Sequence, residues 1–163
     1  INKRRRMNIF VFNSNPRLAA KDHPKSYLVK MPLETAQLLC TAHHVLNPNK
    51  YDIPYKKTHE NHPCAKWVRQ TKENYLWAIE YGLGLCEWFT KTRKKQHGCE
   101  EIIRWAEASV DKIKFLDSGL KTFALAMPDE YKTTDPVVSY RAYFKGEKKR
   151  LATWEQETPE WWT

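Results

Sequence analysis

The order of apolar and polar residues predicts a chain built mainly from helices. Apolar side chains recur at helical spacing over residues 26–46, where Pro32 interrupts them, so a helix either begins near that proline or kinks there. The same spacing predicts further helices over residues 65–91, 100–113 and 137–154. These stretches account for about half of the chain and set the fold class as mainly α.

The segments between these helices have different patterns. Residues 7–13 are apolar, β-branched and aromatic, which predicts a short strand or an extended plug. Asn15-Pro16 is a good helix entry, and we expect one or two helical turns over residues 16–23. Residues 47–64 contain three prolines and read as a long loop, and residues 117–131 as a loop with a short helical turn.

Several residues indicate how the elements pack. Gly82 and Gly84 lower helix propensity but permit a close approach between helices. Trp161 and Trp162 are expected to dock on the core, with a stacking wedge for nucleic acid as the alternative. We therefore expect a single compact domain over residues 7–163, of four to five helices with a possible short N-terminal strand, behind a basic leader at residues 1–6.

Length and composition narrow the class of protein. At 163 residues, with 41% apolar residues, the chain suits one packed domain. Only 5 glycines argue against a β-sandwich or barrel, which needs many tight turns. No apolar run approaches the roughly 18 residues of a transmembrane helix, and no secretory signal is apparent. We expect a soluble protein of the cytoplasm with no membrane partner.

The charge is unevenly distributed along the chain. Residues 1–75 carry 14 Lys and Arg against 5 Asp and Glu, whereas residues 76–163 carry 14 of each. A one-sided basic surface suits a polyanion, because each neutralised phosphate releases a condensed counterion. Nucleic acid, DNA above all, is the expected partner, and a well-solvated surface without a partner is the alternative.

The cysteines and histidines do not predict a metal site. Cys40, Cys64, Cys86 and Cys99 are unevenly spaced and are expected to be reduced thiols. The cluster His59-x-x-His62-x-Cys64 matches no standard zinc spacing. We expect neither a metal nor an organic cofactor.

A first candidate site contains a carboxylate beside amines and a phenol. On a helix, Tyr27, Lys30 and Glu34 are spaced i, i+3 and i+7 and project from one side. A carboxylate, an amine and a phenol in this arrangement could carry out acid–base or imine chemistry. The alternative is an ordinary Lys30–Glu34 surface pair worth about 0.2–0.5 kcal/mol. The catalytic candidates are Glu34, Lys30 and Lys25.

Further polar residues are candidates for substrate contact. The loop over residues 58–63 concentrates polar side chains, and imidazoles that cap backbone groups are an equal alternative. Tyr140 and Arg141 offer an aromatic and a guanidinium group to stacked bases, although core packing accounts equally for a tyrosine. The substrate-binding candidates are Tyr27, His23, His59, Asn61, His62, Tyr140 and Arg141.

The chain also resembles a known family along nearly its whole length from Met7. The residues that carry the resemblance are Met7-Asn-Ile-Phe-Val, Lys30-Met31-x-Leu33-Glu34-Thr35-Ala36-Gln37-Leu38-Leu39, Asn61-His62-Pro63-Cys64, Ala126-Met127-Pro128-Asp129-Glu130-Tyr131, Tyr140-Arg141-x-Tyr143 and Thr158-Pro159-x-Trp161. This pattern resembles small phage-encoded proteins identified as pyrimidine-dimer DNA glycosylases. The architecture is also similar to the phage-type endonuclease V.

The resemblance implies a site. In endonuclease V an amine attacks the sugar C1′ to form an imine, and a glutamate early in the first long helix supports base loss and strand cleavage. Glu34 corresponds to that glutamate, while Tyr27 stands where the family has a histidine. The family's nucleophile is its N-terminal α-amine, whereas six residues precede Met7 here. The nucleophile is then Lys30 or Lys25, or a terminus near Asn8 if those six residues are not native.

These observations support a DNA-repair enzyme as the leading hypothesis: a DNA glycosylase and AP lyase acting on damaged or modified pyrimidines through an imine. A non-catalytic phage nucleic-acid-binding accessory protein is the alternative. A base- or nucleotide-modifying transferase is a third, although the chain has no Gly-rich phosphate loop. An amine in contact with Glu34 in a concave site favours the enzyme, and full exposure of Lys30 and Glu34 favours the binder.

Overall fold

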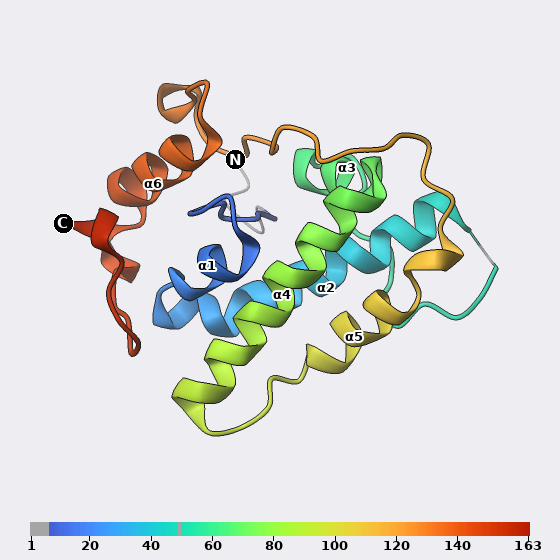
Figure 1. The fold of residues 1–163 in the computed structure, drawn as a ribbon, viewed down its shortest axis with the longest axis horizontal. Coiled ribbons are helices and arrows are strands. Elements are labelled where there is room, and N and C mark those ends of the chain that lie inside the picture. Colours follow the sequence, from blue (N-terminus) through green and yellow to red (C-terminus); the bar gives the residue numbers. More distant parts are fainter. Residues whose placement is uncertain (1–6, 49) are drawn as a thin grey trace.

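The computed structural model describes residues 7–48 and 50–163, so the leader expected at residues 1–6 lies outside the described part. As expected, these residues form a mainly helical domain (Figure 1). The α-helices are α1 (Pro16–Lys21), α2 (Lys25–Leu46), α3 (Pro63–Gln70), α4 (Lys72–Arg93), α5 (Glu100–Ala108) and α6 (Pro136–Glu147). Short 3-10 turns follow at η1 (Val110–Lys112), η2 (Asp129–Tyr131), η3 (Lys149–Leu151) and η4 (Glu160–Trp162).

Two long helices, α2 and α4, cross at the centre of the domain (Figure 1). A Cβ at Gly82 of α4 would lie 2.9 Å from the Thr35 Cγ2 of α2 and 3.0 Å from the Ile103 Cδ1 of α5. A Cβ at Gly84 would lie 2.8 Å from the Ala20 Cβ of α1. The two glycines therefore allow the close helix packing expected of them.

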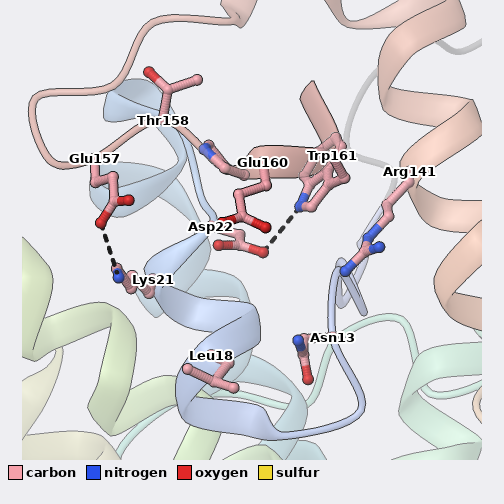
Figure 2. Close-up of a pocket in the computed structure, with 10 residues that line it drawn as sticks. Asn13, Leu18, Lys21, Asp22, Arg141, Glu157, Thr158, Glu160 and Trp161 are labelled. Atoms are coloured by element: carbon pink, nitrogen blue, oxygen red, sulfur yellow. Dashed lines mark hydrogen bonds and ion pairs between the residues drawn. The ribbon is translucent and has the colours of Figure 1, made fainter. Parts of the chain in front are cut away.

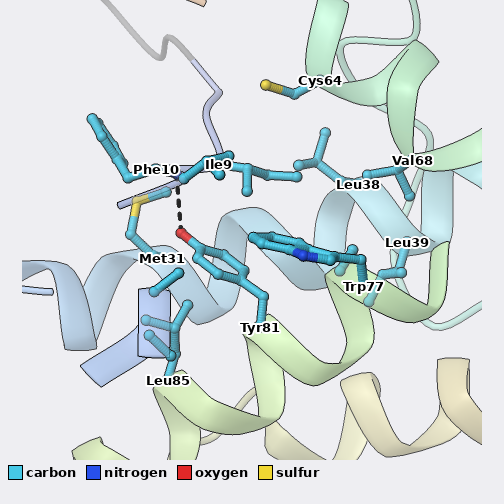
Figure 3. Packing of buried hydrophobic residues seen from close by; sticks show 14 of the residues in the cluster. Ile9, Phe10, Met31, Leu38, Leu39, Cys64, Val68, Trp77, Tyr81 and Leu85 are labelled. Carbon is cyan, nitrogen blue, oxygen red and sulfur yellow. Dashed lines mark hydrogen bonds between the residues drawn. The ribbon is translucent and has the colours of Figure 1, made fainter. Parts of the chain in front are cut away.

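The N-terminal segment over residues 7–12 is buried among the helices (Figure 3). The possible strand there is not found: the described residues contain no strand, and this segment has neither regular secondary structure nor a β-partner. Its backbone bonds to side chains instead, since the Phe10 N–H donates to the Tyr81 hydroxyl at 3.3 Å. Apolar residues favoured the strand, but helices and loops surround the segment and no strand lies beside it, so the segment is a buried plug.

Helix boundaries differ from the sequence expectation at several points. The single helix expected over residues 65–91 is two, because Thr71 is extended (φ −142°, ψ 160°) and its hydroxyl caps α4 by accepting the Asn74 N–H. The chain therefore has six α-helices rather than four or five in its described part. The expected last helix ends at Glu147, and Pro32 lies inside α2 rather than at its start.

The C-terminal tail packs back on the domain, as expected. The Trp161 ring lies 4.9 Å from the Phe12 ring, and the Trp162 ring lies 5.5 Å from the Phe144 ring of α6. The four cysteines are free and buried, and no described helix is long and apolar enough to cross a bilayer.

Candidate functional site

Glu34 lies at the edge of a pocket of about 360 Å³ on α2. Its side chain is only 8% exposed, whereas that of Lys30 one turn earlier is 61% exposed. This burial excludes the interpretation of Lys30 and Glu34 as an ordinary surface pair. The pocket is lined by Met7, Lys30, Leu33, Glu34, Gln37, Thr58 and His59.

The two carboxylate oxygens of Glu34 have different surroundings. Oε1 accepts the backbone N–H of Asn8 at 3.1 Å. Oε2 lies 3.7 Å from the Lys30 Nζ, an ion-pair distance that is too long for a hydrogen bond. Oε2 is itself buried and has no hydrogen-bond partner among the described residues. One half of this carboxylate is thus held firmly while the other is left available.

The backbone of Asn8 is fixed by its own side chain. The Asn8 Oδ1 accepts the Ile9 N–H at 2.8 Å, and its Nδ2 donates to the Ala126 carbonyl at 3.0 Å. The Cys64 thiol donates to the same Oδ1 at 3.7 Å. The contacts with Ala126 and Cys64 tie the N-terminal segment to two distant parts of the chain and hold the Asn8 nitrogen against Glu34.

The electrostatics of Glu34 suit proton transfer near neutral pH. Burial raises its pKa to about 7, and the positive charge of Lys30 and the Asn8 hydrogen bond oppose that rise. A group with a pKa near the working pH is well placed to act as a general acid and as a general base. Burial thus brings the pKa of Glu34 into the range in which a carboxyl group can exchange a proton near neutral pH.

The other catalytic candidate, Lys25, is held away from this pocket. Its Nζ lies 3.6 Å from a Glu155 carboxylate oxygen. Nine residues of helix, about 13 Å, separate it from Glu34. The structure brings Lys30 to Glu34 and leaves Lys25 apart.

The 58–63 loop contributes one of its candidates, His59, to the pocket. The Thr58 backbone is anchored to α2, since its N–H donates to the Thr41 hydroxyl and its carbonyl accepts from that hydroxyl, both at 3.1 Å. The His59 Nδ1 is 2.6 Å from the Thr58 Oγ1, and His59 has a left-handed backbone (φ 50°). Such a strained conformation in a non-glycine residue is concentrated at functional sites.

The neighbouring loop candidates have other places. Asn61 is exposed in the same turn and does not line the pocket. The His62 Nδ1 accepts the Cys64 N–H at 3.0 Å and caps α3, as the capping alternative expected. Burial, with a smaller effect of His59, lowers the His62 pKa.

His23 and Tyr27 belong to the core. His23 is fully buried: its Nδ1–H donates to the Ala19 carbonyl at 2.6 Å, and its Nε2 accepts from the Tyr81 hydroxyl at 2.8 Å. Burial lowers the His23 pKa to about 3, so the ring stays neutral. Tyr27 stacks on Phe10 with ring centroids 4.8 Å apart.

Tyr140 and Arg141 also lie outside the Glu34 pocket. Tyr140 is buried, and its hydroxyl donates to the Ala124 carbonyl at 2.5 Å. It therefore packs in the core, which was the alternative to base stacking. Arg141 donates from Nε to the Phe12 carbonyl at 2.9 Å and lies over the Trp161 ring at 5.5 Å.

Arg141 lines a second, wider pocket of about 650 Å³ between α1 and the C-terminal tail (Figure 2). Asp22 faces it and accepts the Trp161 indole N–H at 2.9 Å, while Lys21 and Glu157 form an ion pair at 3.4 Å. Both cations and carboxylates line this pocket, which shares no lining residue with the Glu34 pocket.

No protein-family model, curated protein or solved structure matches this chain. The site therefore has to be interpreted from its own geometry. Among the described residues, no group of three or more His, Cys, Asp and Glu is arranged to hold a metal ion.

The sequence alone gave no role in this site to two polar residues, Gln37 and Thr58, and it considered Asn8 only as a chain terminus. Asn8 left a usable signal, because it is the one polar residue in the apolar run over residues 7–12. Gln37 follows Glu34 by one helical turn and could have been placed beside it. Nothing in the spacing of Thr58 indicates that a loop returns to α2 at that point.

Proposed function

We propose that this protein is a DNA glycosylase and AP lyase that acts on damaged or modified pyrimidines. The observation that carries the proposal is the buried Glu34 carboxyl, with a pKa raised to about 7, beside the Asn8 nitrogen and the Lys30 amine. An amine and a tunable carboxyl group in one pocket are the two groups that imine chemistry at a sugar requires.

The reaction assigns Glu34 two successive roles. An unprotonated amine attacks the sugar C1′ as the bond from C1′ to the base breaks, and the protonated Glu34 carboxyl gives its proton to the departing base. A proton passes from the attacking nitrogen to O4′, and the sugar ring opens to leave an imine between that nitrogen and C1′. The Glu34 carboxylate next takes a proton from C2′, and the 3′ phosphate leaves by β-elimination. Water finally releases the amine.

Two nitrogen atoms are placed for this attack. Lys30 Nζ lies 3.7 Å from Glu34 Oε2 and is an amine in the chain as it stands. The Asn8 nitrogen lies closer, 3.1 Å from Oε1, but it belongs to a peptide bond and becomes an amine only in a chain that begins at Asn8. Lys25 is the weaker candidate because Glu155 holds it elsewhere.

Strand cleavage by the Glu34→Gln protein tests the proposal. On end-labelled duplex DNA, irradiated with ultraviolet light or carrying an abasic site, we expect this variant to lose cleavage while it keeps its affinity. Gln retains an oxygen for the Asn8 N–H but cannot exchange a proton. Glu130→Gln, at an exposed position, is the matched control and should cleave normally. Unchanged cleavage by Glu34→Gln would rule out the role given to Glu34.

A further inference from the structure

One face of the first half of α2 is left uncovered beside the Glu34 pocket. Val29 and Leu33 are 44% and 41% exposed, large values for aliphatic residues on a central helix. Lys30 lies between them on the same face, and Ser26 precedes them by one turn. Lys30 and Leu33 also line the pocket, so this face leads directly to Glu34.

The turn that follows α4 lies along one side of this face. Arg93 donates to the Lys25 carbonyl at 3.2 Å, and the His97 Nε2–H donates to the Val29 carbonyl at 2.8 Å. The His97 tautomer follows from its Nδ1, which accepts the Cys99 N–H. Between these two anchors lie Lys94 and Lys95, both exposed.

The end of α6 and η3 lie along the opposite side. The Lys25 N–H donates to the Thr153 carbonyl at 2.7 Å, which joins the start of α2 to the chain just after η3. Lys148 lies 5.6 Å from the Tyr143 ring centre, as Lys30 lies 5.9 Å from the Tyr27 ring centre.

The Phe10 ring stacks between those two tyrosines, with centroid distances of 4.8 Å to Tyr27 and 6.2 Å to Tyr143. Lys30 and Lys148 therefore lie at the two ends of one aromatic stack. Lys149 and Arg150 follow Lys148 and are exposed.

Cations outnumber carboxylates on this surface. Glu155 pairs with both Lys25 and Arg93, at 3.6 and 3.7 Å, and Glu147 is exposed at the end of α6. The cations are Lys25, Lys30, Arg93, Lys94, Lys95, Lys148, Lys149 and Arg150. Six of the eight come from residues 76–163, a half of the chain that is formally neutral, so folding gathers positive charge here that the sequence average conceals.

We propose that a DNA strand lies along this face of α2, with its phosphates contacted by Lys94 and Lys95 on one side and by Lys148–Arg150 on the other. Val29 and Leu33 then meet the sugars and bases that approach the Glu34 pocket. We name this surface, made of Ser26, Val29, Lys30 and Leu33 with the two basic flanks, the α2 strip. The assignment of DNA as the partner of the α2 strip rests on the proposed function.

Charge complementarity favours a nucleic acid over an anionic bilayer as the occupant. Two separate rows of cations on either side of a narrow helix face match phosphates that are spaced along a backbone. A helix that binds a bilayer presents a broad apolar face for insertion, whereas only two half-exposed aliphatic side chains are present on this one.

The salt dependence of DNA binding tests the α2 strip. One flank is neutralised by Lys94→Asn with Lys95→Gln, where Asn suits the left-handed backbone of Lys94 (φ 59°). The other flank is neutralised by Lys149→Gln with Arg150→Gln. Lys66→Gln with Lys114→Gln, two exposed cations outside both flanks, is the matched control. Circular dichroism establishes that each variant is folded.

Binding is measured on a short, unmodified DNA duplex over a series of NaCl concentrations. Each flank variant should lower the slope of log K against log salt by between about one and two, because each lost phosphate contact reduces the slope by about one. The control variant should keep the wild-type slope. An equal change in the control, or no change in the flank variants, would overturn the proposal, as would flank-dependent binding to phosphatidylserine vesicles without binding to DNA.

The outcome of this binding measurement is independent of the cleavage test of the proposed function, because undamaged DNA is bound without being cleaved. If the flanks set the slope while cleavage does not depend on Glu34, the strip stands and the protein is a binder. If cleavage depends on Glu34 while the flanks leave the slope unchanged, the strip is wrong and the enzyme stands.

Discussion

The backbone N–H of Asn8 donates to the Glu34 carboxylate at 3.1 Å across a separation of 26 residues. This bond joins the buried N-terminal segment to the third turn of α2. It satisfies a buried amide that has no β-partner, and it fixes one oxygen of a carboxylate that has little other solvation. The fold of the N-terminal segment and the chemistry of the pocket are thus one feature of the molecule.

The raised pKa of Glu34 predicts a pH-dependent gain in stability for Glu34→Gln. The folded protein holds the proton up to about pH 7, whereas an unfolded glutamate releases it near its ordinary pKa of 4.5. The ionised Glu34 side chain therefore lowers the unfolding free energy above pH 7, and this effect becomes smaller as the pH falls towards 4.5. Glu34→Gln should raise the unfolding free energy at pH 8 by up to about 3 kcal/mol.

The measurement is urea unfolding from pH 5 to pH 8, with Glu130→Gln as an exposed control that should show no such trend. A difference between wild type and Glu34→Gln that is constant with pH would contradict a raised Glu34 pKa.

Two buried histidines predict acid sensitivity of the opposite sign. Burial lowers the pKa of His23 to about 3 and that of His43 to about 4. Below about pH 6.5 these histidines bind protons in the unfolded chain but not in the folded chain, so the unfolding free energy falls as the pH falls. Each histidine should cost about 2 kcal/mol between pH 6.5 and pH 5.

Protonation of Glu34 raises the unfolding free energy of the wild-type protein as the pH falls over the same range. The loss of stability caused by the two histidines is therefore measured most cleanly in the Glu34→Gln protein. Imidazole proton NMR checks the cause, since both rings should still be neutral at pH 5. An unfolding free energy that stays flat between pH 6.5 and pH 5 in this variant would show that the two rings are protonated in the folded state.

The sequence predicted the fold better where local signals decide the structure. Asn15 caps α1 with a proline at the first position, and this helix begins where that signal places it. Helix α6, capped by Asp135, begins at Pro136, one residue before the expected start at residue 137. The break at Thr71 was missed because the apolar period continues across it, and one threonine cap is a weak signal in a polar stretch. The apolar, β-branched pattern of residues 7–13 allowed a short strand or an extended plug, and packing among helices and loops decided against the strand.

The site was predicted only in part, for a physical reason. The helical spacing of Lys30 and Glu34 is a local feature, so their proximity could be predicted from the sequence. The burial of Glu34 depends on Met7 and on the loop at Thr58, which reach α2 only through the tertiary fold. The core positions of His23 and Tyr140 likewise follow from neighbours that are distant in sequence.

The approach of α4 to its neighbours predicts a cost for a single methyl group. Gly82→Ala would place a Cβ 2.9 Å from Thr35 Cγ2 and 3.0 Å from Ile103 Cδ1, so these side chains or the helices that carry them must shift. We expect a loss of about 1–3 kcal/mol in unfolding free energy. Gly98→Ala is the control, because no atom lies within 4 Å of its Cβ position. Equal stability of the two variants would contradict the tight crossing.

Borohydride trapping on end-labelled duplex DNA tests the central claim most directly. The substrates are irradiated DNA, unirradiated DNA and DNA with an abasic site, and peptide mapping locates the bonded amine. A covalent adduct on the irradiated strand, mapped to Lys30 or to the terminus of a chain that begins at Asn8, is the predicted result. Lys30→Gln should then remove the adduct of the full chain, and Lys25→Gln should leave it. The absence of an adduct on any strand, with salt-sensitive binding intact, would contradict the imine mechanism.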